Sequence, residues 1–420
     1  MYSLEEIVDF SRRNSPFFAN LYRSISLQNY TINDLPLIDT TEYWKMERGI
    51  SDWSVLTGPV GSGIVFRSGG TTGASKLSIF TREEWNAFLQ TFSSGVSSII
   101  EPNDRIANLF FSGDLYASLL FIHGTLGFVE KPVCEFPFTG QTALADVSEG
   151  IVNYQINVIA ALPATLLTLS EWLIERAKTL PQITKLLYGG ESLLKPQLGV
   201  IARAFPNARC NSIGCASVDA GLIGASTPDC DADEHRCFDG ATLIEILDEQ
   251  DGTAISEPGK PGMLVVTNLQ RKLMPIIRYP VGDRAVWVEK TGQTNRKFRL
   301  MGRSSLGKRI RIGYVSLYPD DIDAFIAGTL GACSWQLVID YADPVNIVNV
   351  RIAQPDNQDA AAKVLEFVRL NNPPLVKLEA NSQAELRCTF CNHSDLVLNS
   401  RTGKLLRVVD NRPYQTNPVN

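Results

Sequence analysis

The hydrophobic positions near residue 80 predict a short strand followed by a helix. Between residues 81 and 92, four large apolar side chains recur at the spacing of one helical face. Thr81 and Glu84 stand in the order of a reciprocal capping box, so the helix is predicted to begin directly after Thr81. The run "LSIF" at residues 77–80 indicates a short strand between this helix and a glycine-rich stretch.

Further along the chain, apolar runs alternate with helical patterns. Residues 156–178 read as strand, turn and helix, residues 183–205 repeat that order, and "ARCNSIG" at 208–214 begins it again. Such alternation predicts parallel strands joined by right-handed crossovers. Ligands of these sheets gather beyond the carboxyl ends of the strands. "YGGES" (188–192) and "SIGCASVD" (212–219) both follow predicted strands, so they are candidates for a ligand site.

From about residue 240 the pattern changes to strands and turns, which favours hairpins or a small barrel. A break follows near "GRSSLGKRIRIG" (302–313), and the remainder is long enough for a small α+β domain. The predicted fold class is therefore α/β. We expect a large N-terminal domain at 1–303 with parallel sheets, a β-rich subdomain at about 240–300, and a small mobile C-terminal domain at 304–420.

Composition narrows the class of protein. With 420 residues, 44% hydrophobic and 20% charged, the chain is expected to be a soluble globular protein of two or three domains. The net charge of −6 argues against a nucleic-acid-binding protein. The first residues hold no apolar run of signal-peptide length, and the uncharged run 151–170 is interrupted by polar residues and Pro163. A cytoplasmic location without a membrane span is expected, and the oligomeric state is left open.

The eight cysteines are expected to be reduced thiols. Two groups, Cys230 with Cys237 and Cys388 with Cys391, contain soft metal ligands, but zinc needs four ligands in a tetrahedral array. Their spacings match no common zinc finger. Unliganded cysteines are therefore favoured over a structural zinc site.

The stretch "SGGTTGASK" at 68–76 combines glycines, hydroxyls and a lysine. Clusters of this kind are often surface turns. They also let the backbone approach an anion closely and point its N–H groups at phosphate oxygens. The spacing is not that of a Walker loop, so a kinase or ATPase interpretation is disfavoured.

Five stretches occur in one order along the chain: residues 68–76, "GGESL" (189–193), "PIIRYPVGD" (275–283), residues 302–313 and "SRTGKLLRVVD" (400–410). With these five stretches in this order, the sequence resembles the acyl-adenylate-forming enzymes, and it is most similar to their phenylacetate–CoA ligase-like branch. The resemblance extends from Ser68 nearly to the C-terminus. It implies a phosphate loop, an adenine-binding turn, a ribose-binding stretch, a hinge and a terminal signature, in that sequence.

The resemblance assigns roles to individual residues. Lys404 corresponds to the catalytic lysine of the terminal signature, and Asp283 and Arg303 correspond to the ribose contacts. Ser217 replaces a hydroxyl residue of the family. The nucleotide-binding residues implied are Ser68, Gly69, Gly70, Thr71, Thr72, Gly73, Lys76, Gly189, Gly190, Glu191, Gly214, Ser217, Asp283 and Arg303.

One stretch departs from the family pattern. The family has an aromatic residue, a glycine and a hydroxyl residue directly followed by Glu, whereas this chain has Ile213 for the aromatic and Asp219 further along. Asp219 is expected to bind Mg²⁺ in place of the Glu if the loop bulges. Otherwise the site is weakened, and the alternative is a degenerate relative that binds nucleotide or acid without chemistry.

Taken singly, these residues also have ordinary structural interpretations. Asp283 follows a glycine as turn residues do, Lys404 follows Gly403 in a hairpin pattern, and Glu191 would cap a helix. Tyr116, His123 and Phe128 are candidates for the wall of an acid-binding pocket. His123 stands between apolar runs, which favours packed core over a catalytic role.

The resemblance implies ATP-dependent adenylation of a carboxylic acid, with ATP and Mg²⁺ as cofactors and an aromatic or flat apolar acid as substrate. A biosynthetic enzyme acting on a phenazine carboxylic acid, in antibiotic biosynthesis, is one candidate. Coenzyme A is the family's usual acceptor. An amine, a carrier protein or a reductase stays open as the alternative acceptor.

Overall fold

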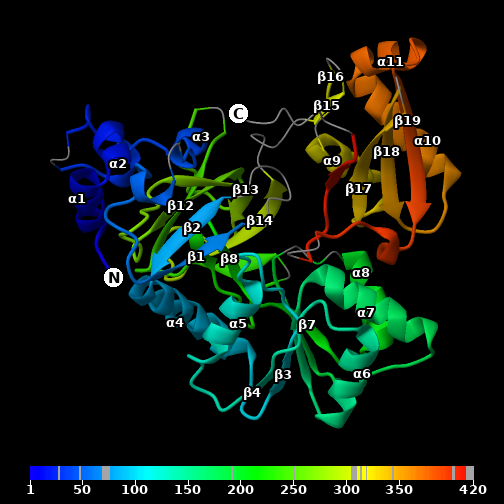
Figure 1. Cartoon of the computed structure of the whole chain (residues 1–420), viewed down its shortest axis with the longest axis horizontal. Coiled ribbons are helices and arrows are strands. Elements are labelled where there is room, and N and C mark those ends of the chain that lie inside the picture. The colour runs from blue at the N-terminus through cyan, green and yellow to red at the C-terminus, as the bar shows by residue number, and fades with distance from the viewer. Residues whose placement is uncertain are drawn as a thin grey trace.

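The computed structural model describes residues 1–412 apart from 27–28, 47–48, 69–75, 191–192, 194, 232, 250, 304–309, 313–314, 318, 343–344 and 400–402. Figure 1 shows the whole chain, with the C-terminal elements in yellow to red standing beside the remainder. The architecture is α/β, as predicted. The predicted boundary between residues 303 and 304 adjoins residues outside the described part, and it stays a prediction.

The parallel sheet carries the strand–helix alternation predicted from the sequence. Its strand order is β4-β3-β5-β6-β7, and every neighbouring pair is parallel. The strands are β3 (Arg105–Asn108), β4 (Cys134–Phe136), β5 (Val158–Ala161), β6 (Lys185–Tyr188) and β7 (Arg209–Ser212). The helices are α5 (Ser118–Leu126), α6 (Leu144–Asn153), α7 (Pro163–Glu175) and α8 (Lys195–Ala204). All four residues of β5 are buried, as expected of a central parallel strand.

Two small hairpins and one long helix adjoin this sheet. β1 (Gly63–Arg67) pairs antiparallel with β2 (Leu77–Thr81), and β8 (Cys215–Ser217) pairs with β9 (Gly221–Gly224). Helix α4 (Arg82–Ile99) begins at Thr81, and both hydrogen bonds of the predicted capping box with Glu84 are present. The strand and the helix start predicted from the sequence near residue 80 are confirmed.

The β-rich region is an antiparallel sheet in the order β10-β14-β13-β12-β11. Four consecutive strands form a meander, in agreement with the predicted hairpins. The strands are β10 (Glu234–Arg236), β11 (Thr242–Leu247), β12 (Pro261–Asn268), β13 (Tyr279–Trp287) and β14 (Lys297–Arg303).

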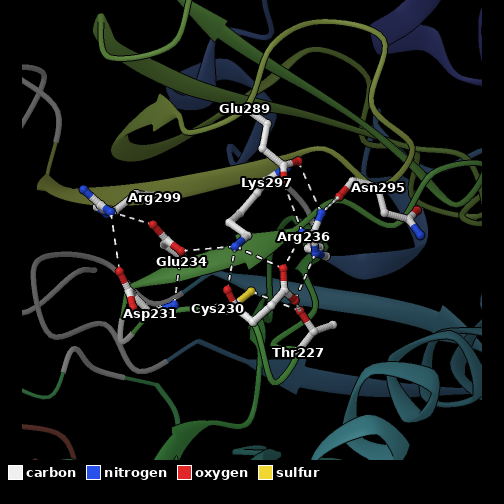
Figure 2. A network of polar contacts seen from close by, with 10 residues as sticks. Thr227, Cys230, Asp231, Glu234, Arg236, Glu289, Asn295, Lys297 and Arg299 are labelled. Atoms are coloured by element: carbon white, nitrogen blue, oxygen red, sulfur yellow. Dashed lines mark hydrogen bonds and ion pairs between the residues drawn. The ribbon is translucent and has the colours of Figure 1, made fainter.

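Figure 2 shows a polar network between β10 and β14. Lys297 lies 3.1 Å from a carboxylate oxygen of Asp229 and 3.5 Å from one of Glu234, while Arg236 lies 3.0 Å from Glu289. Arg299 also pairs with Glu234. These paired charges connect the loop ahead of β10 to the neighbouring strand, and thereby fix the strand that carries His235.

The N-terminal segment packs on the β-rich sheet. Its elements are α1 (Leu4–Asn14), α2 (Pro16–Leu21), η1 (Ile32–Asp34), α3 (Thr40–Tyr43) and η2 (Ile50–Asp52). Their apolar side chains share one buried core with β11, β12 and β13. Backbone hydrogen bonds from Tyr2 to Leu269 and from Thr57 to Leu273, both 3.0 Å, join this segment to the turn between β12 and β13.

The C-terminal region is a mixed sheet in the order β19-β18-β17-β20, covered by helices. Its core is separate from the others and is built around the fully buried Trp335. The strands of this sheet are β17 (Trp335–Ala342), β18 (Val345–Ala353), β19 (Ala384–Cys391) and β20 (Val408–Asp410). Ahead of them, β15 (Ile310–Ile312) and β16 (Val315–Leu317) form a separate antiparallel pair. The helices are α9 (Pro319–Leu330), α10 (Gln358–Asn371), α11 (Pro373–Ala380) and η3 (His393–Asp395).

Within the described part of the chain, no helix combines the length and the apolar character that crossing a bilayer requires. All eight cysteines are free thiols. Burial raises the pKa of Cys210 and of Cys333 to about 11, so these two thiols are protonated at neutral pH.

Candidate functional site

The carboxyl ends of β6 and β7 are followed by two glycines whose backbone conformations favour glycine. Gly190 follows β6 with φ +81°, and Gly214 follows β7 with φ +120°. A Cβ on Gly214 would lie 2.7 Å from the ring of Phe92, and one on Gly189 would lie 2.8 Å from Ile213. Both turns therefore need glycine for backbone conformation or space, and they lie at one edge of the sheet, as the sequence predicted.

Lys404 reaches this sheet edge from the other end of the chain. A Cβ placed on Gly190 would lie 3.2 Å from Cε and 3.6 Å from Nζ of Lys404. The Asn399 N–H donates to the Lys404 carbonyl at 2.8 Å, and the Gly403 N–H donates to the Asn399 carbonyl at 2.7 Å. This juxtaposition brings a cationic side chain to the loop that the sequence marked as a ligand-binding turn.

Three further contacts join the C-terminal region to the parallel-sheet region. Gln197 of α8 donates to the Ser334 hydroxyl at 2.8 Å. The ring of Phe111, which follows β3, lies against Gly403. Helix α7 packs against η3, which brings Glu171 close to His393 and Ser394. Burial raises the pKa of Glu171, although the backbone of Ser394 and His393 acts in the opposite direction.

A second cluster surrounds Lys76, which directly precedes β2. Its ammonium lies 2.7 Å from Oδ2 of Asp219 and 2.6 Å from the hydroxyl of Tyr279. Tyr279 in turn donates to Asp219 Oδ2 at 2.8 Å, and the Trp44 indole donates to the Tyr279 oxygen at 3.1 Å. Ser68, at the other side of the glycine-rich stretch, accepts from the Lys76 N–H at 2.9 Å through its hydroxyl.

The Asp219 side chain is only 13% exposed, and its carboxylate is ionised. Burial alone would raise its pKa, but the Lys76 ammonium and hydrogen bonds from Lys76, Ser217 and Tyr279 outweigh burial and lower it to about 2. Arg271 is fully buried nearby and donates to the Asp219 carbonyl at 2.9 Å and to Ser78 at 3.0 Å. The loop that carries Asp219 is thus tied to β2 through both its backbone and its side chain.

The two residues predicted to contact the ribose occupy paired positions on adjacent strands. Asp283 on β13 and Arg303 on β14 are paired positions, and a register shift follows between Asp283 and Ala285. Gly282 beside them has φ +90°. The pairing brings both backbone positions together, which neither stretch of sequence indicates on its own.

Comparisons with known proteins show which fold the chain shares. No family model matches the chain. A phenylacetate–coenzyme A ligase of Thermus thermophilus is 24% identical over 276 residues, covering 62% of this chain and 59% of that protein. The match thus spans less than two thirds of that relative's length.

Solved structures match over more of the chain. A 2-hydroxyisobutyryl-CoA ligase in the postadenylation state with 2-HIB-AMP matches 97% of this chain and 88% of its own, at 19% identity and a TM-score of 0.69. The same ligase with 2-HIB-AMP and CoA in the thioesterification state has a TM-score of 0.64 at 18% identity. O-succinylbenzoate coenzyme A synthetase from Bacillus subtilis, with ATP and magnesium, covers 82% of this chain and 68% of its own at 16% identity and a TM-score of 0.50. The chain has the adenylate-forming ligase fold.

Part of the nucleotide site expected for the adenylate-forming fold lies outside the described residues. This holds for Gly69, Gly70, Thr71, Thr72, Gly73 and Glu191. Ser68, Lys76, Gly189, Gly190, Gly214, Ser217 and Asp283 are described, and their roles toward a nucleotide stay predictions. The Ser217 hydroxyl accepts from the Ala220 N–H at 3.0 Å, which shapes the turn around Asp219.

Asp219, as arranged here, does not fit a magnesium ion. Oδ2 accepts from Lys76 and Tyr279, and Oδ1 accepts from the Ala220 N–H at 3.1 Å. An ammonium at Oδ2 repels a second cation at that oxygen. Among the described residues, no three His, Cys, Asp or Glu side chains gather as a metal site. The metal role of Asp219 stays a prediction that requires Lys76 to move away.

The three pocket candidates do not share one environment. Tyr116 is buried in a hydrophobic core, whereas Phe128 is 39% exposed. The core interpretation of His123 is wrong: its side chain is 64% exposed and its Nδ1 lies 2.7 Å from Glu135. The apolar residues around it belong to α5, whose inner face buries Ile122 and leaves His123 outside.

Trp44, Arg271 and His235 were not indicated by sequence patterns. His235 is buried, and its Nε2 lies 3.1 Å from the Ser212 hydroxyl, which accepts from the Gly214 N–H at 3.1 Å. Burial lowers the pKa of His235 to about 4, so the imidazole is neutral at pH 7. A buried, neutral histidine thus supports the glycine turn after β7. No local sequence pattern marks it.

Proposed function

We propose that this chain uses ATP to adenylate a carboxylic acid and then transfers the acyl group to coenzyme A. The observation that carries the proposal is the contact of Lys404 with Gly190 at the carboxyl edge of the parallel sheet. Lys404 lies more than 200 positions beyond Gly190 along the chain, so the fold brings a cationic side chain from the C-terminal region to this edge.

The chemistry explains the need for such a lysine. A carboxylate oxygen of the acid attacks the α-phosphorus of ATP, a new P–O bond forms, and the bond to pyrophosphate breaks. Two anions approach each other in this step, so positioning and charge neutralisation carry the catalysis, with no protein nucleophile. In our proposal the Lys404 ammonium neutralises the attacking carboxylate and the α-phosphate.

Other residues of the proposal bind the nucleotide. Asp283 would accept hydrogen bonds from the ribose hydroxyls, and Lys76 with Ser68 would contact the outer phosphates beside the glycine-rich stretch. The known ligands of the structural relatives support this assignment, because those proteins bind ATP with magnesium, an acyl-AMP, or acyl-AMP with CoA.

The class of acid is the least constrained part of the proposal. We infer an aromatic or flat apolar acid, with the buried Tyr116 as the described candidate for the pocket wall. The comparisons give no support to a phenazine carboxylic acid or to antibiotic biosynthesis. The short hydroxy acid of the 2-hydroxyisobutyryl-CoA ligase is a second class to test.

Acid-dependent exchange of labelled pyrophosphate into ATP tests the proposal. The panel should contain aryl, short hydroxy and fatty acids, with Lys404→Ala as the inactive reference. Exchange with one class of acid supports adenylation. Silence with every acid despite measurable ATP binding would favour a non-catalytic binding protein instead. For an active acid, adding coenzyme A, an amine or a carrier protein identifies the acceptor by the product formed.

A further inference from the structure

Lys76 is held by side chains from three separate parts of the chain. Asp219 follows β8, Tyr279 begins β13, and Trp44 follows α3 in the N-terminal segment. Beyond the short contacts to Asp219 and Tyr279, the Lys76 ammonium lies 5.4 Å from the ring centroids of both Trp44 and Tyr279. A flexible lysine side chain is thereby confined before any ligand arrives.

The hydrogens of this cluster can be assigned in one consistent way. A lysine ammonium has three N–H donors and accepts nothing. Two of them go to Asp219 and to the Tyr279 oxygen. Tyr279 gives its own hydrogen to Asp219, and its oxygen also accepts from the Trp44 indole. The described residues therefore use two of the three donors of Lys76.

The third donor of Lys76 is suited to an anionic ligand. The side chain remains 32% exposed, and its backbone is linked to Ser68 across the glycine-rich stretch, with Ser68 N–H donating to the Lys76 carbonyl at 2.8 Å. A free lysine loses about 2 kcal/mol of rotamer entropy when it is fixed. A lysine that is already fixed does not incur this loss when a phosphate binds.

We propose that Tyr279, Asp219 and Trp44 are positioning residues that hold Lys76 toward the outer phosphates of the nucleotide, and that Asp219 serves this purpose without a metal ion. The inference rests on the proposed function, because it takes ATP as the ligand. It adds that the N-terminal segment contributes to the phosphate site through Trp44.

A double-mutant cycle in calorimetry tests the inference without any catalysis. Binding of ATP, AMP and inorganic tripolyphosphate is measured in EDTA for the wild type, Lys76→Ala, Tyr279→Phe and the double variant. We expect Tyr279→Phe to weaken ATP and tripolyphosphate binding about three- to tenfold and to leave AMP unchanged. In the Lys76→Ala background the same change should have no further effect, because Tyr279 acts through Lys76.

Tyr22→Phe is the matched control. Tyr22 is buried in the same core as Tyr279, and its hydroxyl has no hydrogen-bond partner among the described residues. It should leave all three affinities unchanged. Equal effects of Tyr279→Phe with and without Lys76 would overturn the positioning role. A wild type that binds no ATP would overturn both this inference and the proposed function.

Two further measurements examine Trp44 and Asp219. Addition of tripolyphosphate should change the tryptophan fluorescence of the wild type, and Trp44→Phe should abolish the change. Trp287→Phe should preserve it, because that indole donates to Ile255 at 2.8 Å in the β-rich sheet. A change that persists in Trp44→Phe would exclude Trp44 from the site.

For Asp219, the ratio of ATP affinities with and without Mg²⁺ is compared between the wild type and Asp219→Asn. The inference expects an unchanged ratio. Loss of the magnesium-dependent part in Asp219→Asn would assign the carboxylate to the metal and overturn its positioning role.

Discussion

The ring of Phe111 occupies the space that any side chain at residue 403 would need. A Cβ on Gly403 would lie 2.0 Å from Cε2 of Phe111, and Gly403 has φ +67°, a conformation that favours glycine. A Cβ on Gly140 would meet the same ring atom at 2.0 Å. One aromatic ring therefore fits between two glycines, and one of them, Gly403, immediately precedes Lys404.

Gly403→Ala should lower the rate of adenylate formation about tenfold or more. The added methyl group clashes with Phe111, and alanine is strained at this positive φ. Each effect costs roughly 1–3 kcal/mol in the arrangement that brings Lys404 to Gly190. Pyrophosphate exchange at saturating ATP measures the effect. Gly328→Ala is the control, since a Cβ at that α9 position meets nothing within 4 Å. If Phe111→Ala does not reduce the penalty of Gly403→Ala, the contact is not its cause.

Lys404→Ala should reduce adenylate formation by a factor of about 10² or more, as loss of one preorganised charge at a developing anion can. Acid and ATP should still bind. Conversion of chemically prepared acyl-adenylate to product should continue, because that step does not use Lys404. Both half-reactions are measured on the one variant, with the exposed Lys363 of α10 replaced by alanine as control. Near wild-type adenylation would remove Lys404 from the mechanism, and equal loss of both steps would indicate misfolding.

Asp283→Ala should weaken binding of ATP and AMP alike, by roughly 1.5–3 kcal/mol, because the ribose hydroxyls lose a charged acceptor. Tripolyphosphate, which has no ribose, should bind as before. Calorimetry with ATP, AMP and tripolyphosphate distinguishes loss of the ribose contact from a general loss of ligand binding. Asp251→Ala, at an exposed turn beyond β11, provides the control. Unchanged affinity for AMP would rule out the ribose contact.

His235→Gln should make the protein less sensitive to acid. The pKa of His235 is lowered from its usual 6.5 to about 4, chiefly by burial. Between these two pKa values the unfolded chain binds more protons than the folded protein. The contribution of His235 to the free energy of unfolding is therefore fully present above pH 6.5, and it is lost as the pH falls toward 4. The loss amounts to roughly 3 kcal/mol for this group.

Chemical denaturation at pH 7 and pH 4.5 measures this difference in the free energy of unfolding. A residual fall will remain in His235→Gln, because burial also lowers the pKa of His393 to about 4. An identical fall in wild type and His235→Gln would show that the histidine is not responsible.

The features that could be predicted from the sequence depend on residues close together along the chain. The capping box of Thr81 and Glu84 is confirmed, and so is the parallel sheet with glycine turns after β6 and β7. These features follow from periodicity, capping chemistry and the handedness of crossovers, all of which are local. Glu84 also accepts from the backbone N–H groups of Lys272 and Leu273, at 2.7 and 2.8 Å, which no local pattern indicates.

Contacts between distant residues could not be predicted from the sequence. Lys76 and Asp219 were expected to contact phosphate and metal separately, yet they pair with each other across 143 positions. Tyr279 lies in the predicted ribose-binding stretch 275–283, but no sequence pattern gave it a role of its own. Trp44 lies in the N-terminal segment, for which no site was predicted. The error at His123 has a similar origin, because a run of apolar neighbours does not reveal which side of a helix faces outward.

The N-terminal segment has a consequence for how the protein can be produced and shortened. Tyr43 donates to the Pro275 carbonyl at 2.8 Å, Trp44 reaches Tyr279, and Arg278 donates to the Leu35 carbonyl. Residues that precede the parallel sheet by more than fifty positions are thus part of the support of β13. A recombinant fragment trimmed to begin at β1 would expose to water Tyr279 and other apolar residues of the core that it shares with the N-terminal segment. A minimal version of this protein therefore has to retain its first helices.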